Sequence, residues 1–265
     1  MALRGPTLVG WLAVAACGRV GFESNDETPI GPPSDAIAAR DAAADSATDA
    51  AIDAPPVRVA YVAPLVERSA GTGPVDTFAL QAHAAGNAVV MQVSCAGRAV
   101  PTTVTVTAPG WSFTQLGPIT ASQSSTQRSA IVAAIAPDAL RTTITVSCGG
   151  SQCGESRNEL ADEFSGVDPA GGPQTFASVG AVEGVGRCKG VIALAHAGDA
   201  VWAACNSDDQ VTAVGTGFTL GADDGVGDWS AFQLTDRPAG TVIDVAFENP
   251  DVGFVLSMVT IKPRD

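Results

Sequence analysis

Side chains able to carry out catalysis are few in this chain, and their spacing fits no catalytic pattern. His83 and His196 are the only histidines among the 265 residues, and each is the centre of an Ala-His-Ala segment. A serine nucleophile would need one of them as its base, but no Gly-x-Ser-x-Gly turn is present. An active site rarely needs the same residue in two similar segments, so we expect both histidines to have structural roles in turns.

Acidic residues occur in adjacent pairs, at Asp162-Glu163, Asp208-Asp209 and Asp223-Asp224. Adjacent residues on a strand point to opposite faces of the sheet, so such pairs do not form an acid–base couple by themselves. The two carboxylates of a glycoside hydrolase need not be near each other in the sequence. A polysaccharide hydrolase is therefore the third alternative, while our leading expectation is a protein without catalytic residues or enzymatic activity.

The acidic loop at residues 221–229 contains Asp223, Asp224 and Asp228 among glycines. Carboxylate and carbonyl oxygens of a flexible loop can bind calcium, but this spacing fits no named calcium loop. Zinc is not expected either, because the chain has two histidines and no Cys-x-x-Cys pair. We therefore predict no metal and no other cofactor.

Trp111 and Trp229 lie in segments with loop composition, where their ring faces can stack on a sugar. Both are candidate ligand contacts. Because aromatic residues make up only 5% of the chain, packing in the core is the alternative for each. Trp202 lies inside an apolar run and is expected in the core.

Six cysteines are present, and five of them fall in the region predicted to fold, namely Cys95, Cys148, Cys153, Cys188 and Cys205. In an exported protein disulfides are the default, and an odd number leaves one thiol unpaired or bonded to another chain. One arrangement closes a small loop between Cys148 and Cys153 and joins Cys188 to Cys205, with Cys95 left over. The sequence does not select among the possible arrangements.

Residues 1–16 have the pattern of a bacterial lipoprotein signal peptide, and the sixth cysteine, Cys17, follows it directly. A basic start at Arg4 precedes a short apolar segment, too short to span a bilayer as a permanent helix. Residues 14–17, Val-Ala-Ala-Cys, then resemble a lipobox. We expect export, cleavage before Cys17 and its acylation, including a palmitate chain. Gly18 in place of aspartate favours the outer membrane or cell surface, although inner-membrane sorting stays open.

Residues 17–56 are expected to form a disordered tether after the lipidated cysteine. The segment is mostly Ala, Asp, Ser, Thr and Pro, and residues 23–56 hold eight acidic residues against one base. Without aromatic residues after Phe22, it has too little apolar surface to offset the entropy of folding. A calcium-binding acidic repeat is the rival interpretation, but it lacks the glycines that such sites need.

Residues 57–265 are expected to form an all-β domain, a jelly-roll-like β-sandwich. Short runs rich in Val, Ile and Thr alternate with Gly, Pro, Asn and Asp, which is typical of strands and turns. Residues 102–107 and 142–147 also alternate polar and apolar residues, as half-buried strands do. No window of 12 or more residues combines a helical period with helix caps.

The predicted sandwich contains two pseudo-repeats, about residues 77–167 and 175–262. Three matches occur in the same order in both halves, and they pair residues 82–89 with 195–201, 107–114 with 212–219, and 129–131 with 230–232. Two equivalent sets of strands would each have an apolar face to bury against the other. One large sandwich of two half-repeats is the first expectation, and two packed smaller sandwiches are the alternative.

Two motifs resemble a family of secreted bacterial β-sandwich proteins. The Ala-Gly-Asp or Gly-Asn segment before an apolar strand occurs twice, and residues 159–167 resemble an acidic, aromatic, Ser-Gly-Val strand. The lipobox and the Ala/Asp/Pro tether resemble the surface lipoproteins of myxobacteria. The resemblance implies a β-sandwich at the cell surface, in a largely uncharacterised family that carries over no catalytic residues.

The net charge of −14 argues against binding to nucleic acid or directly to an anionic membrane surface. We therefore expect a lipid-anchored envelope protein that displays a non-catalytic binding or adhesive module, with a glycan or an envelope protein as partner. A structural or assembly role, through a disulfide between chains at the odd cysteine, is the second alternative.

Overall fold

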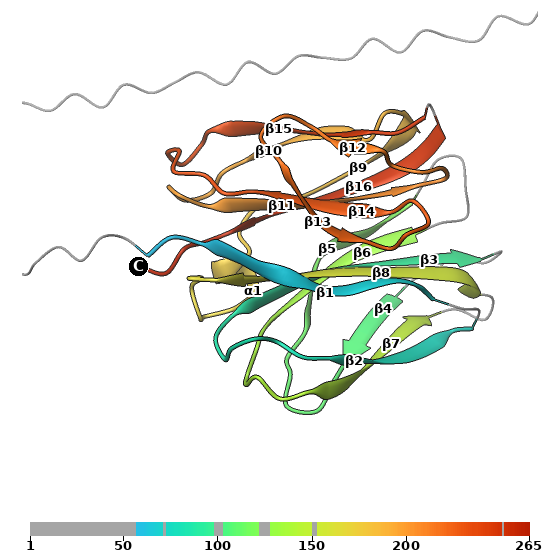
Figure 1. Ribbon diagram of the computed structural model, residues 1–265, viewed down its shortest axis with the longest axis horizontal. Helices are drawn as coiled ribbons and strands as arrows, with labels where there is room; N and C mark the ends of the chain where they lie inside the picture. The colour runs from blue at the N-terminus through green and yellow to red at the C-terminus, as the bar shows by residue number, and fades with distance from the viewer. Residues whose placement is uncertain (1–56, 71–72, 98–102, 122–127, 150–152, 251) are drawn as a thin grey trace, which may run out of the picture. The chain divides into compact units, whose positions relative to one another are not determined.

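The computed structural model describes residues 57–70, 73–97, 103–121, 128–149, 153–250 and 252–265 (Figure 1). The predicted signal peptide, the predicted lipidation site Cys17 and the predicted tether lie outside the described residues. Within the described ranges, no helix is long and apolar enough to cross a membrane. The described residues all belong to the region 57–265, which the sequence predicts to be all-β.

Strands make up almost all of the regular structure, so the predicted all-β sandwich is confirmed. The first half contains β1 (Ala60–Ala70), β2 (Val75–Leu80), β3 (Ala88–Gly97), β4 (Thr103–Thr107), β5 (Thr114–Ala121), β6 (Arg128–Ile135), β7 (Thr142–Gly149) and β8 (Cys153–Ser165). After the short helix α1 (Gly172–Thr175) come β9 (Val179–Gly186), β10 (Lys189–Ala193), β11 (Ala200–Ser207), β12 (Ala213–Val214), β13 (Thr219–Asp223), β14 (Trp229–Gln233), β15 (Val242–Glu248) and β16 (Val252–Ile261).

Each half forms one five-stranded and one three-stranded antiparallel sheet. Inner sheet 1 has the order β1-β8-β3-β6-β5, and outer sheet 1 has the order β2-β7-β4. Inner sheet 2 has the order β9-β16-β11-β14-β13, and outer sheet 2 has the order β10-β15-β12. Each strand of the first half therefore has an equivalent eight strands later, and the predicted duplication is present in the topology.

The pairing within each half is nested, as in a long hairpin that is rolled up. β1 pairs with β8, β2 with β7 and β3 with β6, and the second half repeats this with β9 and β16, β10 and β15, and β11 and β14. A rolled-up hairpin of eight strands in two sheets is a jelly roll. The jelly-roll-like prediction therefore describes each half separately.

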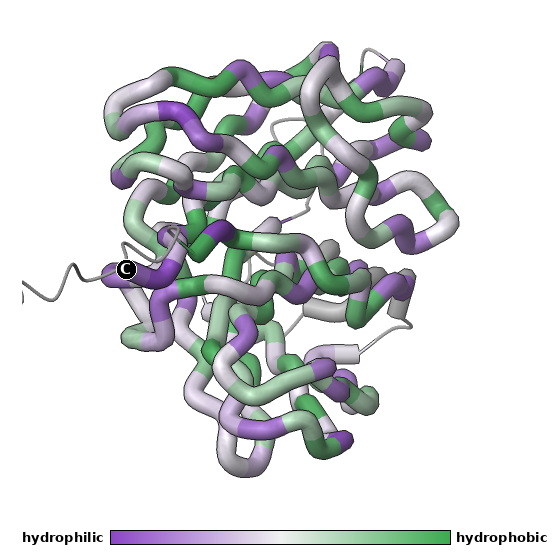
Figure 2. Tube along the Cα trace, turned by 60° about the vertical axis from the view of Figure 1, so that its left-hand side comes forward, coloured by the Kyte–Doolittle hydropathy of each residue, from purple (hydrophilic) through white to green (hydrophobic). Residues whose placement is uncertain are grey.

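Three hydrophobic cores hold the four sheets together, and strand alternation decides which residue enters which core. Along β3, Val89, Met91 and Val93 point between inner sheet 1 and outer sheet 1, in the core of the first sandwich. The second sandwich has its own core, which includes Leu256 and Met258 of β16. Figure 2 shows hydrophobic segments distributed through all the layers of strands.

A central core lies between the two inner sheets and joins the halves. It contains Val90, Phe164, Trp202 and Phe232, which come from both inner sheets. Tyr61 of β1 stacks on Phe232 of β14 with ring centroids 4.0 Å apart. The halves thus bury faces against each other, as expected, but each half is also a sandwich by itself. The alternative of two packed sandwiches describes the arrangement.

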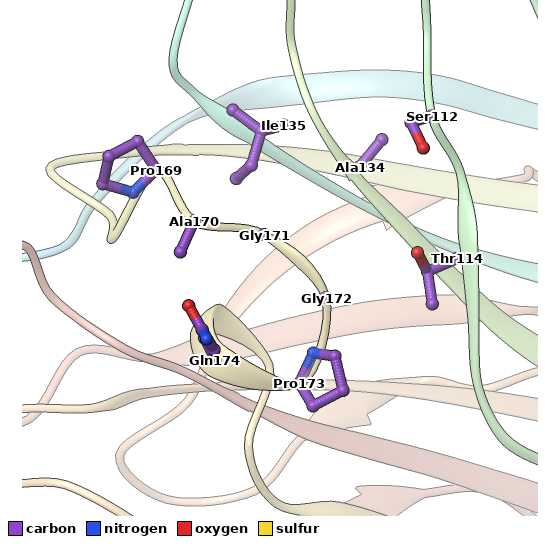
Figure 3. A pocket seen from close by; sticks show the side chains of 10 residues that line it. All are labelled: Ser112, Thr114, Ala134, Ile135, Pro169, Ala170, Gly171, Gly172, Pro173 and Gln174. Carbon is purple, nitrogen blue, oxygen red and sulfur yellow. The ribbon is translucent and has the colours of Figure 1, made fainter.

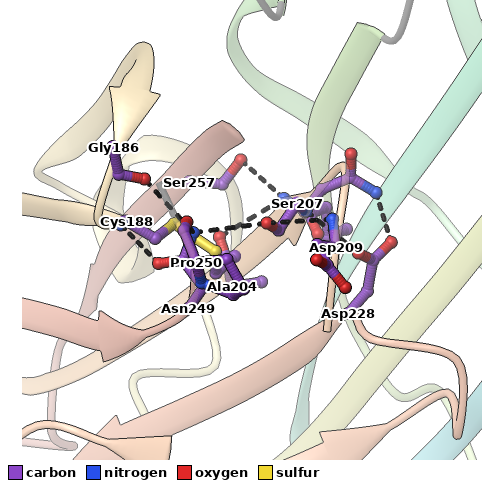
Figure 4. Close-up of a disulfide and its surroundings, with 12 residues drawn as sticks. Gly186, Cys188, Ala204, Ser207, Asp209, Asp228, Asn249, Pro250 and Ser257 are labelled. Carbon is purple, nitrogen blue, oxygen red and sulfur yellow. Dashed lines mark hydrogen bonds between the residues drawn. A yellow bond between two sulfur atoms is a disulfide. The ribbon is translucent and has the colours of Figure 1, made fainter. Parts of the chain in front are cut away.

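One disulfide lies in each sandwich. Cys188, before β10, is bonded to Cys205 of β11, which is one of the expected pairs (Figure 4). Cys148 of β7 is bonded to Cys95 of β3, with their Cα atoms 6.6 Å apart, so the expected loop to Cys153 and an unpaired Cys95 were both wrong. The physical reason is alternation, which points both cysteines into the same core. The side chain of Cys153 lies outside the described residues.

Candidate functional site

The central core contains a buried carboxylate, Asp162. Along β8, alternation points Leu160, Asp162 and Phe164 toward the second sandwich, and all three are buried. An aspartate thus occupies a position between two large apolar residues. Its charge must therefore be balanced by hydrogen bonds within the fold.

Three side-chain donors surround the Asp162 carboxylate. The Tyr61 hydroxyl donates to Oδ1 over 3.1 Å, and Trp202 Nε1 donates to Oδ2 over 2.7 Å. The Ser230 hydroxyl also donates to Oδ2. Tyr61 lies on β1, Trp202 on β11 and Ser230 on β14, so strands of both sandwiches meet at one carboxylate.

Burial dominates the electrostatics of this network. Loss of hydration raises the pKa of Asp162 to about 6, although the hydrogen bonds from Ser230, Trp202 and Tyr61 oppose the shift. Burial and the neighbouring Asp162 also raise the pKa of the Tyr61 phenol above its ordinary value. Because Asp162 is fully buried, it cannot reach a substrate in solvent, and its role is to hold the sandwiches together.

A second buried carboxylate, Asp228, lies in the turn before β14. It accepts hydrogen bonds from the side-chain amides of Asn158 on β8 and Asn206 on β11. The backbone N–H of Ser207 donates to its Oδ1 over 3.1 Å (Figure 4). Burial, and then the nearby Asp224, raise the pKa of Asp228 to about 7. This network also spans both sandwiches, because Asn158 belongs to the first half.

The acidic loop at residues 221–229 satisfies its own backbone. Asp224 Oδ1 accepts hydrogen bonds from the backbone N–H groups of Val226, Gly227 and Asp228, at 2.9 to 3.0 Å. Asp223 Oδ1 accepts one from Gly225 over 2.8 Å. Across the described residues, no group of three or more His, Cys, Asp or Glu side chains is placed to hold a metal ion. Of the carboxylates considered for calcium, Asp223 and Asp224 act here as turn caps, whereas Asp228 belongs to the buried network described above.

Both histidines lie in turns between equivalent strands, and a buried carboxylate holds each turn. The backbone N–H of His83 donates to Glu163, whose Oε2 is also 2.6 Å from the ring Nδ1 of His83. The backbone N–H of His196 donates to Asp199 Oδ2 over 2.8 Å, and the ring lies beside the same carboxylate. This geometry agrees with the structural role expected for both histidines.

The pair Asp162-Glu163 behaves as alternation predicts. Asp162 points into the central core, and Glu163 points to the other face of inner sheet 1, where it binds the His83 turn and the Asn87 amide. The two carboxylates therefore do not act on one substrate. Asp208 and Asp209 are exposed in the loop after β11.

The candidate contacts Trp111 and Trp229 lie in different sandwiches and do not form a shared site. Trp111 stacks on Phe113 with ring centroids 5.4 Å apart, and both pack against the core of the first sandwich. Trp229 is the first residue of β14 and packs against the core of the second sandwich. Both rings are partly exposed, whereas Trp202 is fully buried, as expected for a core residue.

A cavity of about 440 Å³ lies where β5 and β6 meet the segment that connects the two halves (Figure 3). The lining residues carry no charge, and their polar side chains are those of Ser112, Thr114 and Gln174. Such a cavity suits a small neutral molecule. The sequence signal for it is the segment at residues 169–174, Pro-Ala-Gly-Gly-Pro-Gln, whose residue types do not by themselves indicate a site.

Comparison with known proteins found no matching family model, no similar curated protein and no similar solved structure. The resemblance to secreted bacterial sandwich proteins and surface lipoproteins therefore stays a prediction.

Proposed function

We propose that this chain is an exported, lipid-anchored protein of the bacterial cell envelope whose paired sandwiches form a non-catalytic binding or adhesive module. The observation that supports export most directly is the disulfide in each sandwich, because disulfides persist in oxidising compartments. The lipobox-like residues 14–17 support the anchor at Cys17 and a location at the outer membrane or cell surface.

A non-catalytic role is supported by how four of the five acids buried among the described residues are used. Asp162, Glu163, Asp199 and Asp228 are each engaged by donors of the fold itself. A glycoside hydrolase needs two carboxyl groups that face one substrate-sized space. These four acids are buried within the fold, so their positions favour a role in packing and turn formation over a role in hydrolysis.

Palmitate labelling of cells that produce the chain tests the anchor. The wild-type protein is expected to incorporate label and to sediment with membranes, whereas Cys17→Ala is expected to do neither. Equal labelling of the two proteins would show that the lipid, if any, is attached elsewhere.

Binding to polysaccharides tests the display function. The full chain, kept in detergent micelles, is incubated with a panel of envelope and extracellular polysaccharides, and the bound fraction is measured against concentration. Saturable binding to one polysaccharide supports the proposal. No binding across the panel contradicts a glycan partner and leaves an envelope protein as the alternative.

A structural role is the second candidate, since the two disulfides of the described residues use four of the five cysteines considered above. A covalent dimer would then form through Cys153. Electrophoresis without reductant distinguishes the candidates, because a dimer that disappears in Cys153→Ser favours assembly over display.

A further inference from the structure

The outward face of outer sheet 1 is covered by hydroxyl side chains. Alternation along β4 and β7 buries Val104, Val106, Ile144 and Val146 in the first sandwich and turns the residues between them outward. We call the outward set the threonine face, and its members are Thr77, Thr103, Thr105, Thr107, Thr143, Thr145 and Ser147. Outer sheet 1 lies at one end of the stack of sheets (Figure 1).

The hydroxyls of the threonine face form a regular two-dimensional array. Thr145 of the central strand β7 is the register partner of Thr77 on one side and of Thr107 on the other. Thr105 is likewise opposite Ser147. Neighbouring strands lie about 4.8 Å apart, and alternate residues of one strand about 6.6 Å apart, so the hydroxyls repeat in both directions.

The threonine face carries no charge, although the protein is strongly acidic. The outward positions of β2 are Val75, Thr77 and Ala79, and the one charged residue of that strand, Asp76, is turned inward and paired with Arg68 over 3.0 Å. The chain as a whole has a net charge of −14. A face kept neutral on such a protein suits a neutral partner and offers no attraction to a polyelectrolyte.

The duplicated half supplies an internal comparison. Ile243, Val245 and Phe247 of β15 point inward, as Ile144, Val146 and Cys148 of β7 do. Asp244 therefore takes the place of Thr145, and its register partner Val191 takes the place of Thr77. Val242 and Ala246 take the places of Thr143 and Ser147. The same fold in the same chain therefore forms its outer sheet without hydroxyls, and the threonine face is not a requirement of the fold.

We propose that the threonine face binds the flat surface of an insoluble neutral polysaccharide, and this rests on the display function proposed above. Each hydroxyl can donate one hydrogen bond and accept two, which matches a surface of sugar hydroxyls. The threonine methyl groups supply small apolar contacts for the C–H faces of the sugar rings. A regular array favours a ligand that repeats in two dimensions over one short soluble chain.

The test uses the same substitution on the two equivalent faces. The full chain in detergent micelles is mixed with cellulose, chitin or insoluble β-1,3-glucan, with alginate as an acidic polysaccharide, and the bound fraction is measured. Thr77→Lys places a long charged side chain in the array, whereas Val191→Lys places it at the equivalent site of outer sheet 2. Both positions are exposed, so both variants are expected to fold, which the melting temperature checks.

We expect Thr77→Lys to weaken binding to a neutral polysaccharide at least tenfold and Val191→Lys to leave it within twofold of the wild type. Thr105→Val, which keeps the shape and removes one hydroxyl, is expected to weaken it about threefold. If the wild type binds a polysaccharide and Thr77→Lys binds equally well, the threonine face is overturned and the display function stands. If the wild type binds alginate alone, the neutral polysaccharide is overturned as the ligand, and the display function again stands. If the wild type binds none of these materials or the wider panel, the threonine face is overturned and the display function is left with an envelope protein as its partner.

Discussion

Trp202 and Asp162 join the two sandwiches through one buried hydrogen bond, from the indole Nε1 to the carboxylate Oδ2 over 2.7 Å. Trp202 comes from the second sandwich and Asp162 from the first, and both side chains are fully buried. A hydrogen bond to a charged acceptor has a fixed direction, whereas apolar contacts between two flat sheets do not. The pair therefore fixes how the inner sheets lie on each other.

Buried carboxylates of this kind make stability depend on pH in an unusual direction. The pKa of Asp162 is about 6 in the folded protein, above its ordinary value of 3.8. The folded protein thus binds a proton that the unfolded chain releases, and the free energy of unfolding rises as the pH falls through 6. The difference corresponds to about 3 kcal/mol at most, reached below the unfolded pKa.

We expect the melting temperature to rise as the pH is lowered from about 8 to about 5. This is the opposite of acid denaturation caused by carboxylates in ion pairs. Tryptophan fluorescence during heating measures it at each pH. Asp228, with a pKa of about 7, contributes in the same direction. Asp162→Asn is expected to reduce the pH dependence, and Asp162→Asn with Asp228→Asn to abolish most of it. An unchanged slope in the double variant would show that other groups control the effect.

Trp202→Phe tests the contribution of the indole directly. The substitution removes the donor to Asp162 and part of the largest side chain in the central core, so we expect a loss of about 3 kcal/mol in unfolding free energy. Trp111→Phe is the matched control, because that ring is partly exposed and no side-chain hydrogen bond involves it among those of the described residues. Its expected cost is below about 1 kcal/mol. Urea denaturation measures both, and equal losses would mean that the buried indole has no special role.

The strands and their duplication could be predicted from the sequence because they depend on local pattern. Alternation at residues 142–147 gave β7, and the matched Ala-His-Ala segments gave the equivalence of β3 and β11. The partner of each strand could not be predicted in the same way. Whether one half folds on itself or on the other depends on contacts between distant residues, which single-strand periodicity does not contain.

For the site residues as well, the local sequence pattern predicts some features, and contacts between distant residues determine the others. Trp202 was expected in the core because its neighbours are apolar, but its bond to Asp162 depends on packing between the halves. Asp162 lies in the acidic-aromatic segment of β8, where Glu159 and Glu163 are buried as well, and the residue types of the segment do not show that Asp162 is the acid that meets the second sandwich. The pairing of Cys95 with Cys148 was missed, although the apolar alternation around each cysteine shows that both point inward.

Gly221 lies against the same carboxylate network and gives an independent test of it. A Cβ atom at this position would lie 2.5 Å from Ser230 Oγ and 2.8 Å from both oxygens of Asp162. Gly221→Ala must therefore displace the serine or the aspartate, at an expected cost of about 2 kcal/mol. In Gly180→Ala the nearest atom is the flexible end of Met258 at 3.1 Å, so this control is expected to cost less than half as much. The two variants are compared by urea denaturation, and the proposal of a tightly packed network fails if they are equal.

The disulfides are expected to stabilise the two sandwiches unequally. Cys95 and Cys148 are 53 residues apart and Cys188 and Cys205 are 17 apart, so the longer loop restricts the unfolded chain more. The loop-entropy relation gives about 4 and about 3 kcal/mol for the two bonds at 25 °C. We expect Cys95→Ser with Cys148→Ser to lower the unfolding free energy more than Cys188→Ser with Cys205→Ser. Peptide mapping without reductant checks the pairing itself, and a peptide joining Cys148 to Cys153 would contradict it.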